Sequence, residues 1–279
     1  MTFKDIQVHV DIDAACGKRL ELAVNLASKF NAHLTGVHVR RLFPYPAYGV
    51  LSASESVGVF EAYNEVLGDH ESTARATFDR VIGQVNPAVS WRATTGSPAN
   101  ELAEDARYCD LLVLGQADHN DEFSLNDGLA DKIIMSAGRP CLLVPFRGSP
   151  VEFGQSPLIA WDGSREASRA VHDALPLLKL AGKATFIIVE PEKLGTNFGN
   201  LPGAAIAEHL ARHDITITVE VSRDSKQNTG DTILTYADAY GHDLIVMGAY
   251  GHSRLREVVV GGATRTIMKK AEVPVLLSH

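Results

Sequence analysis

The stretch DLIVMGAYGHSRLREVVVGGAT, residues 243–264, decides how this chain folds. It begins with an Asp and an apolar run typical of a buried strand, and glycines follow at positions 248, 251, 261 and 262. Glycine allows positive φ and close approach of an anion, and the N-terminus of a following helix attracts negative charge. The stretch therefore predicts a strand, a glycine loop and a helix, which form either a phosphate site or an ordinary turn.

The same unit occurs twice in the chain. DARYCDLLVLG at 105–115 matches DAYGHDLIVMG at 238–248, and AGRPCLLVPF at 137–146 matches AEVPVLLSH at 271–279. An internal repeat of this kind indicates two similar domains. We place them at 1–147 and 156–279, on either side of a segment where Gly, Pro and Ser accumulate.

Strands alternate with helical segments in both domains. We expect strands near 4–11, 33–40, 88–94, 110–115 and 140–145, and again near 157–162, 183–190, 215–222, 243–248 and 273–278. Helical crossovers of this length join parallel strands that are buried on both faces. The predicted fold class is α/β, with two tandem doubly wound five-stranded parallel sheets of strand order 3-2-1-4-5. The first domain carries an insertion at 42–69, which contains prolines and aromatics and which we expect to be a surface loop.

Composition excludes several classes of protein. The 279 residues are 45% hydrophobic, and 26 basic against 34 acidic residues give a net charge of −8. An acidic chain without a basic stripe is not expected to bind nucleic acid or anionic membrane. The chain start lacks a signal-peptide pattern, and no apolar run is long enough to span a membrane, so we expect a cytoplasmic protein. Cys16, Cys109 and Cys141 lack metal-site spacing and are expected to be reduced.

Two strand ends mark the predicted site. Strand one of the second domain ends at Asp162 and strand four at Gly248. With order 3-2-1-4-5 these ends are neighbours at the point where the strand order reverses, which is where such sheets bind ligands. Asp162 could accept hydrogen bonds from adenine or ribose, or it could cap the helix that follows Gly163 and Ser164.

On these features the whole chain resembles the universal stress proteins in their tandem two-domain form. Nucleotide-binding members share the pattern Gly, two residues, Gly, nine residues, Gly, then Ser or Thr; here the glycines are Gly248, Gly251 and Gly261. The hydroxyl residue is replaced by Gly262, although Thr264 could supply a hydroxyl nearby. The resemblance implies an adenine nucleotide alpha hydrolase-like fold. We also expect a β-branched residue at position 251 to block the loop.

The resemblance further implies that the second domain binds ATP, or AMP or ADP, with or without Mg²⁺. The residues that would bind it are Ala160, Asp162, Val189, Met247, Gly248, Gly251, Gly261, Gly262, Ala263 and Thr264. We find no catalytic constellation, so the implied function is that of a regulatory, non-catalytic module in the stress response. The alternatives are a slow ATP hydrolase that uses the same pocket and a nucleotide-free interaction scaffold.

The first domain departs from the pattern. Its corresponding positions are Gly115, Asp118, Gly128 and Leu129, so a carboxylate replaces one glycine and we expect no ATP there. The acidic loop 116–127 could instead hold a cation, or simply be solvated. The last strands, 141–145 and 275–279, are expected to pair as an internal pseudo-dimer, and a homodimer is possible as well.

Overall fold

The structure is a computed structural model of the chain. It describes residues 2–42, 53–83, 88–118, 126, 128–148, 152–193, 203–223, 227–251 and 262–279, and for 53–57 the backbone only. None of the helices in these ranges is long and apolar enough to cross a membrane. The predicted contact residue Gly261 and most of the acidic loop 116–127 lie outside the described residues.

Strands and helices alternate along the chain, as predicted. The first half contains β1 (Asp5–His9), α1 (Cys16–Phe30), β2 (His33–Arg41), α2 (Ala53–Ile82), β3 (Val89–Gly96), α3 (Pro98–Asp105), β4 (Leu111–Gly115), α4 (Leu129–Ser136) and β5 (Cys141–Val144). The second half contains β6 (Pro157–Ala160), α5 (Arg165–Ala181), β7 (Lys183–Val189), α6 (Ala204–Ala211), β8 (Thr216–Ser222), α7 (Thr229–Ala239), β9 (Leu244–Gly248), α8 (Gly262–Lys270) and β10 (Val275–Ser278).

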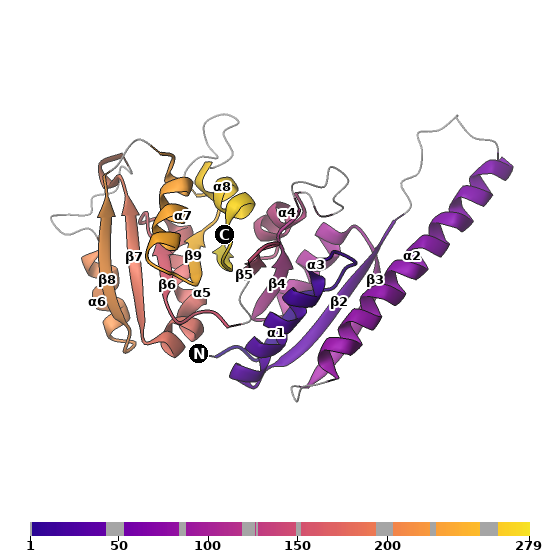
Figure 1. Ribbon diagram of the computed structural model, residues 1–279, viewed down its shortest axis with the longest axis horizontal. Helices are drawn as coiled ribbons and strands as arrows, with labels where there is room; N and C mark the ends of the chain where they lie inside the picture. Colours follow the sequence, from indigo (N-terminus) through magenta and orange to yellow (C-terminus); the bar gives the residue numbers. More distant parts are fainter. Residues whose placement is uncertain are drawn as a thin grey trace.

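The strands form one sheet that runs through both halves (Figure 1). Its order is β3-β2-β1-β4-β5-β10-β9-β6-β7-β8, so each half has the predicted order 3-2-1-4-5. The two five-stranded sheets are continuous, because β5 and β10 pair antiparallel, with Leu143 opposite Val275 and Cys141 opposite Leu277, which is the pairing expected of the last strands. An edge strand with unpaired backbone groups is a ready partner for another, and this pairing satisfies both edges.

Two apolar cores lie on opposite faces of the sheet, because successive side chains of a strand point to opposite sides. Leu111 and Val113 of β4 belong to the core under α1, α2, α5 and α6, and Leu112 and Leu114 belong to the core under α3, α4, α7 and α8. Each core continues from one half into the other. The central strands are therefore buried on both faces, as their apolar sequences predicted, whereas the outer strands β3 and β8 are mostly half-buried or exposed.

The 42–69 insertion is not simply a loop. Helix α2 begins at Ala53 and extends outward from the first half (Figure 1), so much of the segment is helical, and 43–52 lies outside the described residues. Pro and aromatic residues near the start of the insertion suggested a loop, but from Ala53 onward few helix breakers remain. The three cysteines are free and buried, as expected.

Side chains also join the two halves. The Gln116 amide donates to the backbone oxygens of Met268, at 2.9 Å, and Ala271, at 3.3 Å. The Tyr250 hydroxyl donates to the Asp131 carboxylate of α4. Gln116 is the first residue after β4 and Tyr250 the second after β9, so both strand-end loops are held against the opposite half.

Candidate functional site

In the second half, the end of β6 is shaped by two short-range hydrogen bonds. The Asp162 carboxylate accepts from the backbone N–H of Ser164 at 2.9 Å, and the Ser164 hydroxyl oxygen accepts from the N–H of Ala167 at 3.1 Å. Ser164 is therefore the N-cap of α5. The alternative role for Asp162, as the cap itself, is wrong, since its carboxylate instead orders the turn before the cap.

Gly248, the last residue of β9, lies directly against the beginning of α5. A Cβ at this position would lie 2.5 Å from the backbone N of Ala167 and 2.5 Å from the carbonyl carbon of Glu166. No side chain fits there without displacing backbone. This glycine thus brings the strand end next to the N-terminus of α5, where the helix dipole favours negative charge.

A cavity of about 80 Å³ opens beside this contact. Six of the predicted residues line it: Ala160, Asp162, Val189, Met247, Gly248 and Ala263. Its other lining residues, Trp161, Ile187, Thr229 and Ile233, did not emerge from the sequence. Ile187 could have been found, because it alternates with Val189 on β7 and so faces the same side of the sheet.

Gly251, Gly262 and Thr264, the other predicted residues that the structure describes, do not line this cavity. Gly262 begins α8, and a Cβ there would meet nothing within 4 Å. The Thr264 hydroxyl oxygen accepts from the backbone N–H of Tyr250 at 3.5 Å, so Thr264 contacts the glycine loop and does not line the cavity.

Gly251 does not have the backbone conformation that we expected. Among the residues of the loop that the structure describes, Tyr250 has a positive φ, of 56°, and Gly251 does not. A Cβ at Gly251 would meet its nearest atom, a carboxylate oxygen of Glu166, at 3.4 Å. A positive φ is therefore not the reason for glycine at 251, and the expectation that a β-branched residue there would block the loop stays a prediction.

Glu166 is a charged neighbour of this loop that the sequence did not reveal. It is buried in the first turn of α5 and pairs with Arg165 at 2.9 Å. Burial opposes its charge, but hydrogen bonds from its own backbone N–H and from Arg165 keep the pKa of Glu166 below its ordinary value. A carboxylate therefore stands beside the glycine loop.

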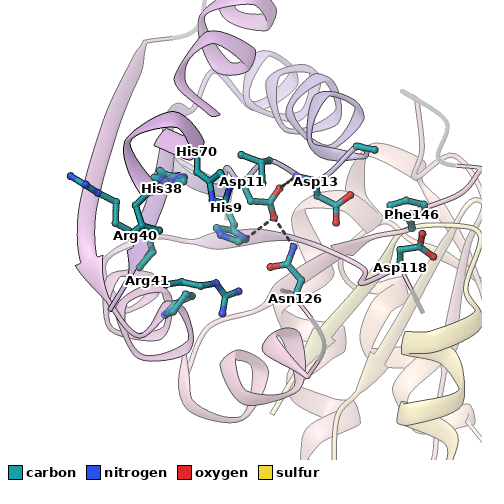
Figure 2. A pocket seen from close by; sticks show the side chains of 15 residues that line it. His9, Asp11, Asp13, His38, Arg40, Arg41, His70, Asp118, Asn126 and Phe146 are labelled. Atoms are coloured by element: carbon teal, nitrogen blue, oxygen red, sulfur yellow. Dashed lines mark hydrogen bonds and ion pairs between the residues drawn. The ribbon is translucent and has the colours of Figure 1, made fainter. Parts of the chain in front are cut away.

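The equivalent strand end of the first half carries a larger cavity, of about 380 Å³ (Figure 2). The Asp11 carboxylate lies at its base and accepts from Arg19 at 2.6 Å, from the Asn126 amide at 2.8 Å and from the Asp13 N–H at 3.1 Å. Burial disfavours charge on Asp11, but the Arg19 guanidinium outweighs this and holds its pKa well below the usual range. Asp11 is therefore ionised and fully engaged.

Arg19 occupies the space beside the end of β4. Its side chain is only 1% exposed, its Nε donates to the His9 carbonyl at 2.8 Å, and one of its terminal nitrogens would lie 1.9 Å from a Cβ at Gly115. In the second half, the position at the same separation from the strand-end aspartate is Ala170, whose methyl side chain carries no charge and no hydrogen-bond donor. The prediction that the first half lacks the nucleotide pattern thus gains a further reason, a cation built into its strand end.

Two histidines, His9 and His38, also line the first-half cavity. The His38 Nδ1–H donates to the Val10 carbonyl at 2.8 Å, and His9 lies 3.5 Å from Asp11. Burial lowers the pKa of His9 to about 4, against the opposing pull of the Asp11 carboxylate. His9 is consequently neutral near pH 7, so its contact with Asp11 is not an ion pair there.

Comparison with known proteins agrees with this architecture. Residues 157–279 match the model of the Universal stress protein family. Universal stress protein Slr1230 from Synechocystis sp. is 27% identical over 170 residues, which are 60% of this chain and 57% of that protein. Universal stress protein MJ0577 from Methanocaldococcus jannaschii is 36% identical over 47 residues, 17% of this chain and 29% of that protein. The matches thus span less than two thirds of either relative.

Solved structures match over nearly the whole chain. A universal stress protein from Archaeoglobus fulgidus superposes with a TM-score of 0.69 at 16% identity. The superposition covers 98% of this chain and 95% of the Archaeoglobus chain. A putative universal stress protein from Pseudomonas aeruginosa superposes with a TM-score of 0.57 at 16% identity, with 99% and 93% covered. These superpositions establish a shared fold for both halves. At identities this low they establish the fold alone.

Proposed function

We propose that the second half, whose residues 157–279 match the Universal stress protein family, binds an adenine nucleotide, ATP or AMP, as a regulatory and non-catalytic module of the stress response. The observation that carries the proposal is the cavity between β6 and β9, which six residues of the expected set line. In a parallel sheet the reversal of strand order is the usual place for a ligand.

The cavity would hold only part of the nucleotide. Its volume of about 80 Å³ is below the roughly 300–1,000 Å³ of whole small-molecule sites. The apolar side chains of Ile187, Val189 and Met247 suit the base, and Asp162 suits the ribose or the base edge. The phosphates would then lie toward the first turns of α5 and α8, whose N–H groups attract anions.

We further propose that 1–147 and 156–279 act as two domains and that the pairing of β5 with β10 makes them an internal pseudo-dimer. Gln116 and Tyr250 link each strand-end loop to the opposite half. Nucleotide bound at Gly248 would therefore act on the loop that also contacts α4. This route would turn occupancy into a change that a partner could read, without any chemistry on the nucleotide.

The test has two parts. The purified full chain is denatured and the released small molecule is identified; intact ATP or AMP supports the proposal. ADP that accumulates with time would support a slow hydrolase instead, and an empty protein would support a scaffold. Binding of ATP is then measured by calorimetry in A263L, whose larger side chain fills the cavity, and in the first-half control D118N. The proposal expects lost binding in A263L and unchanged binding in D118N.

A further inference from the structure

We propose that the two halves form a site between them for a small phosphate monoester with several hydroxyl groups, such as a sugar phosphate. The site is a cavity of about 310 Å³, which falls within the range of small-molecule sites. It shares one lining residue, Asn126, with the first-half cavity. The proposal does not depend on nucleotide binding by the second half.

Both halves contribute to the walls of this cavity. Helices α4 and α8 lie on the same face of the sheet, on either side of the joint between β5 and β10 (Figure 1). Asp131 of α4 lines one wall, and Arg265, Met268 and Lys269 of α8 line the other. The buried Gln116 side chain, which also lines the cavity, donates to the Met268 carbonyl at 2.9 Å. A ligand in the cavity would therefore contact both halves.

The α8 wall carries two cations that repel each other. Arg265 and Lys269 are four residues apart, so they lie one turn apart on the same side of the helix, where like charges are unfavourable. In the part of the chain that the structure describes, neither forms an ion pair, whereas the next residue, Lys270, pairs with Asp231 at 2.9 Å. A dianion in the cavity would relieve this repulsion. Arginine suits phosphate in particular, because its guanidinium can donate to two phosphate oxygens at once.

The α4 wall carries an acceptor that is held in place. The Asp131 carboxylate accepts from the Tyr250 hydroxyl, which fixes it against the opposite half. A carboxylate has about four acceptor positions, so it can also accept from a ligand hydroxyl. It would repel a phosphate placed beside it. The phosphate of the ligand thus belongs at α8 and its hydroxyl groups at α4, an arrangement that inorganic phosphate cannot satisfy.

The rest of the lining indicates the size and type of the ligand body. It is mostly small or apolar, as at Ala130 and Leu143, and the residues described around the cavity include no aromatic ring on which a base could stack. The volume is near the lower limit for small-molecule sites. These features suit a sugar or polyol better than a nucleotide.

The cavity is distinct from the candidate nucleotide site of the second half, although both use α8. Ala263 lines the nucleotide cavity, and Arg265 lines the cavity between the halves. Two residues along a helix correspond to a rotation of about 200°, so these side chains point to nearly opposite sides of α8. Substitutions on the two sides can therefore separate the two sites.

The experiment titrates the full chain by calorimetry with glycerol 3-phosphate, glucose 6-phosphate, inorganic phosphate and glycerol. We expect saturable binding of at least one of the two esters, about threefold or more tightly than inorganic phosphate, and no binding of glycerol. R265Q and K269Q should each weaken binding of that ester about fivefold or more, and R265K and K269R should restore part of it.

The variant D131N tests the orientation of the ligand. It removes the negative charge from the α4 wall, so inorganic phosphate should bind more tightly and the preference for the ester should shrink. A loss of folding would weaken binding of both probes and could not produce this opposite change. Weaker binding of inorganic phosphate by folded D131N would overturn the proposed arrangement.

Two further variants are controls. K270Q removes a cation from the same helix and should leave binding of the ester unchanged, as should A263L, which is expected to lose ATP. Thermal melting followed by circular dichroism verifies that each variant is folded. The proposal is overturned if neither ester gives saturable binding, if inorganic phosphate binds as tightly as both esters, if folded R265Q and K269Q bind like the unmodified chain, or if folded A263L loses the ester.

Discussion

Both halves have an aspartate after their first strand, but the surroundings of the two aspartates differ. Asp11 and Asp162 each follow the first strand of a half, but Asp11 is engaged by the buried guanidinium of Arg19, whereas Asp162 accepts from the N–H of Ser164 and orders the turn before α5. Where Arg19 lies beside Gly115, the second half instead places the N-terminus of α5 beside Gly248. One buried side chain thus gives the strand-end aspartate of the first half an internal ion pair, so the two halves share the sheet but differ at this strand end.

The largest expected effect comes from removing the cation that sets the halves apart. R19M leaves the Asp11 carboxylate buried without its main counter-charge, and loss of one member of a buried pair typically costs about 3–5 kcal/mol. We expect the free energy of unfolding, measured in urea, to fall by that amount.

A double variant shows whether charge is the cause. R19M/D11N removes both charges and should recover much of the lost stability, because no unpaired ion remains. The matched change in the second half, A170M, tests crowding alone. If R19M costs less than about 1 kcal/mol, the ion pair does not hold the strand end together as described.

Acid should destabilise the first half through His9. Burial lowers the pKa of His9 to about 4, below the 6.5 of an unfolded histidine, so the unfolded chain binds its proton first as the pH falls. The stability contributed by neutral His9 is present above pH 6.5 and is lost between about 6.5 and 4, by roughly 3 kcal/mol. The corresponding residue of the second half is Ala160, which cannot titrate.

Urea unfolding at pH 7 and pH 4 measures this difference. H9Q should lose less stability than the unmodified chain over that interval, and H33Q, which changes an exposed histidine, should lose as much as the unmodified chain. Hydrogen exchange should locate the weakened region in β1 and β2. Equal losses in H9Q and the unmodified chain would contradict a neutral buried His9.

The sequence predicted more of the candidate site in the second half than of the cavity in the first half. Asp162 and Gly248 could be found because each directly follows an apolar strand, and strand order then makes them neighbours. Arg19 could not, because a charged residue in a helix ordinarily faces solvent. Its burial depends on Asp11 and on the absence of a side chain at Gly115, both of which only the folded chain brings to it. The joining of the two sheets could be expected only from the resemblance to a family, because the periodicity of a strand does not indicate which strand its edge will pair with.

Gly248 should be required for packing in the second half. G248A places a Cβ 2.5 Å from backbone atoms of both Glu166 and Ala167, and overpacking of this kind costs about 1–3 kcal/mol. Gly262 is the matched control, because a Cβ there meets nothing within 4 Å, and G262A should keep or slightly raise stability. Thermal unfolding of both variants measures the contrast, and equal effects would contradict the close approach of β9 to α5.

The smallest expected effect concerns Glu166, the carboxylate beside the glycine loop. If phosphates lie at the N-terminus of α5, its charge opposes them, and E166Q should tighten ATP binding about twofold, since charges several ångströms apart near water interact by less than about 1 kcal/mol. Calorimetry on E166Q and on E192Q, which alters an exposed glutamate, measures the change. Weaker binding by E166Q would reverse the argument: the carboxylate would then assist the nucleotide, and the two halves would share a reliance on a buried acid at the strand end.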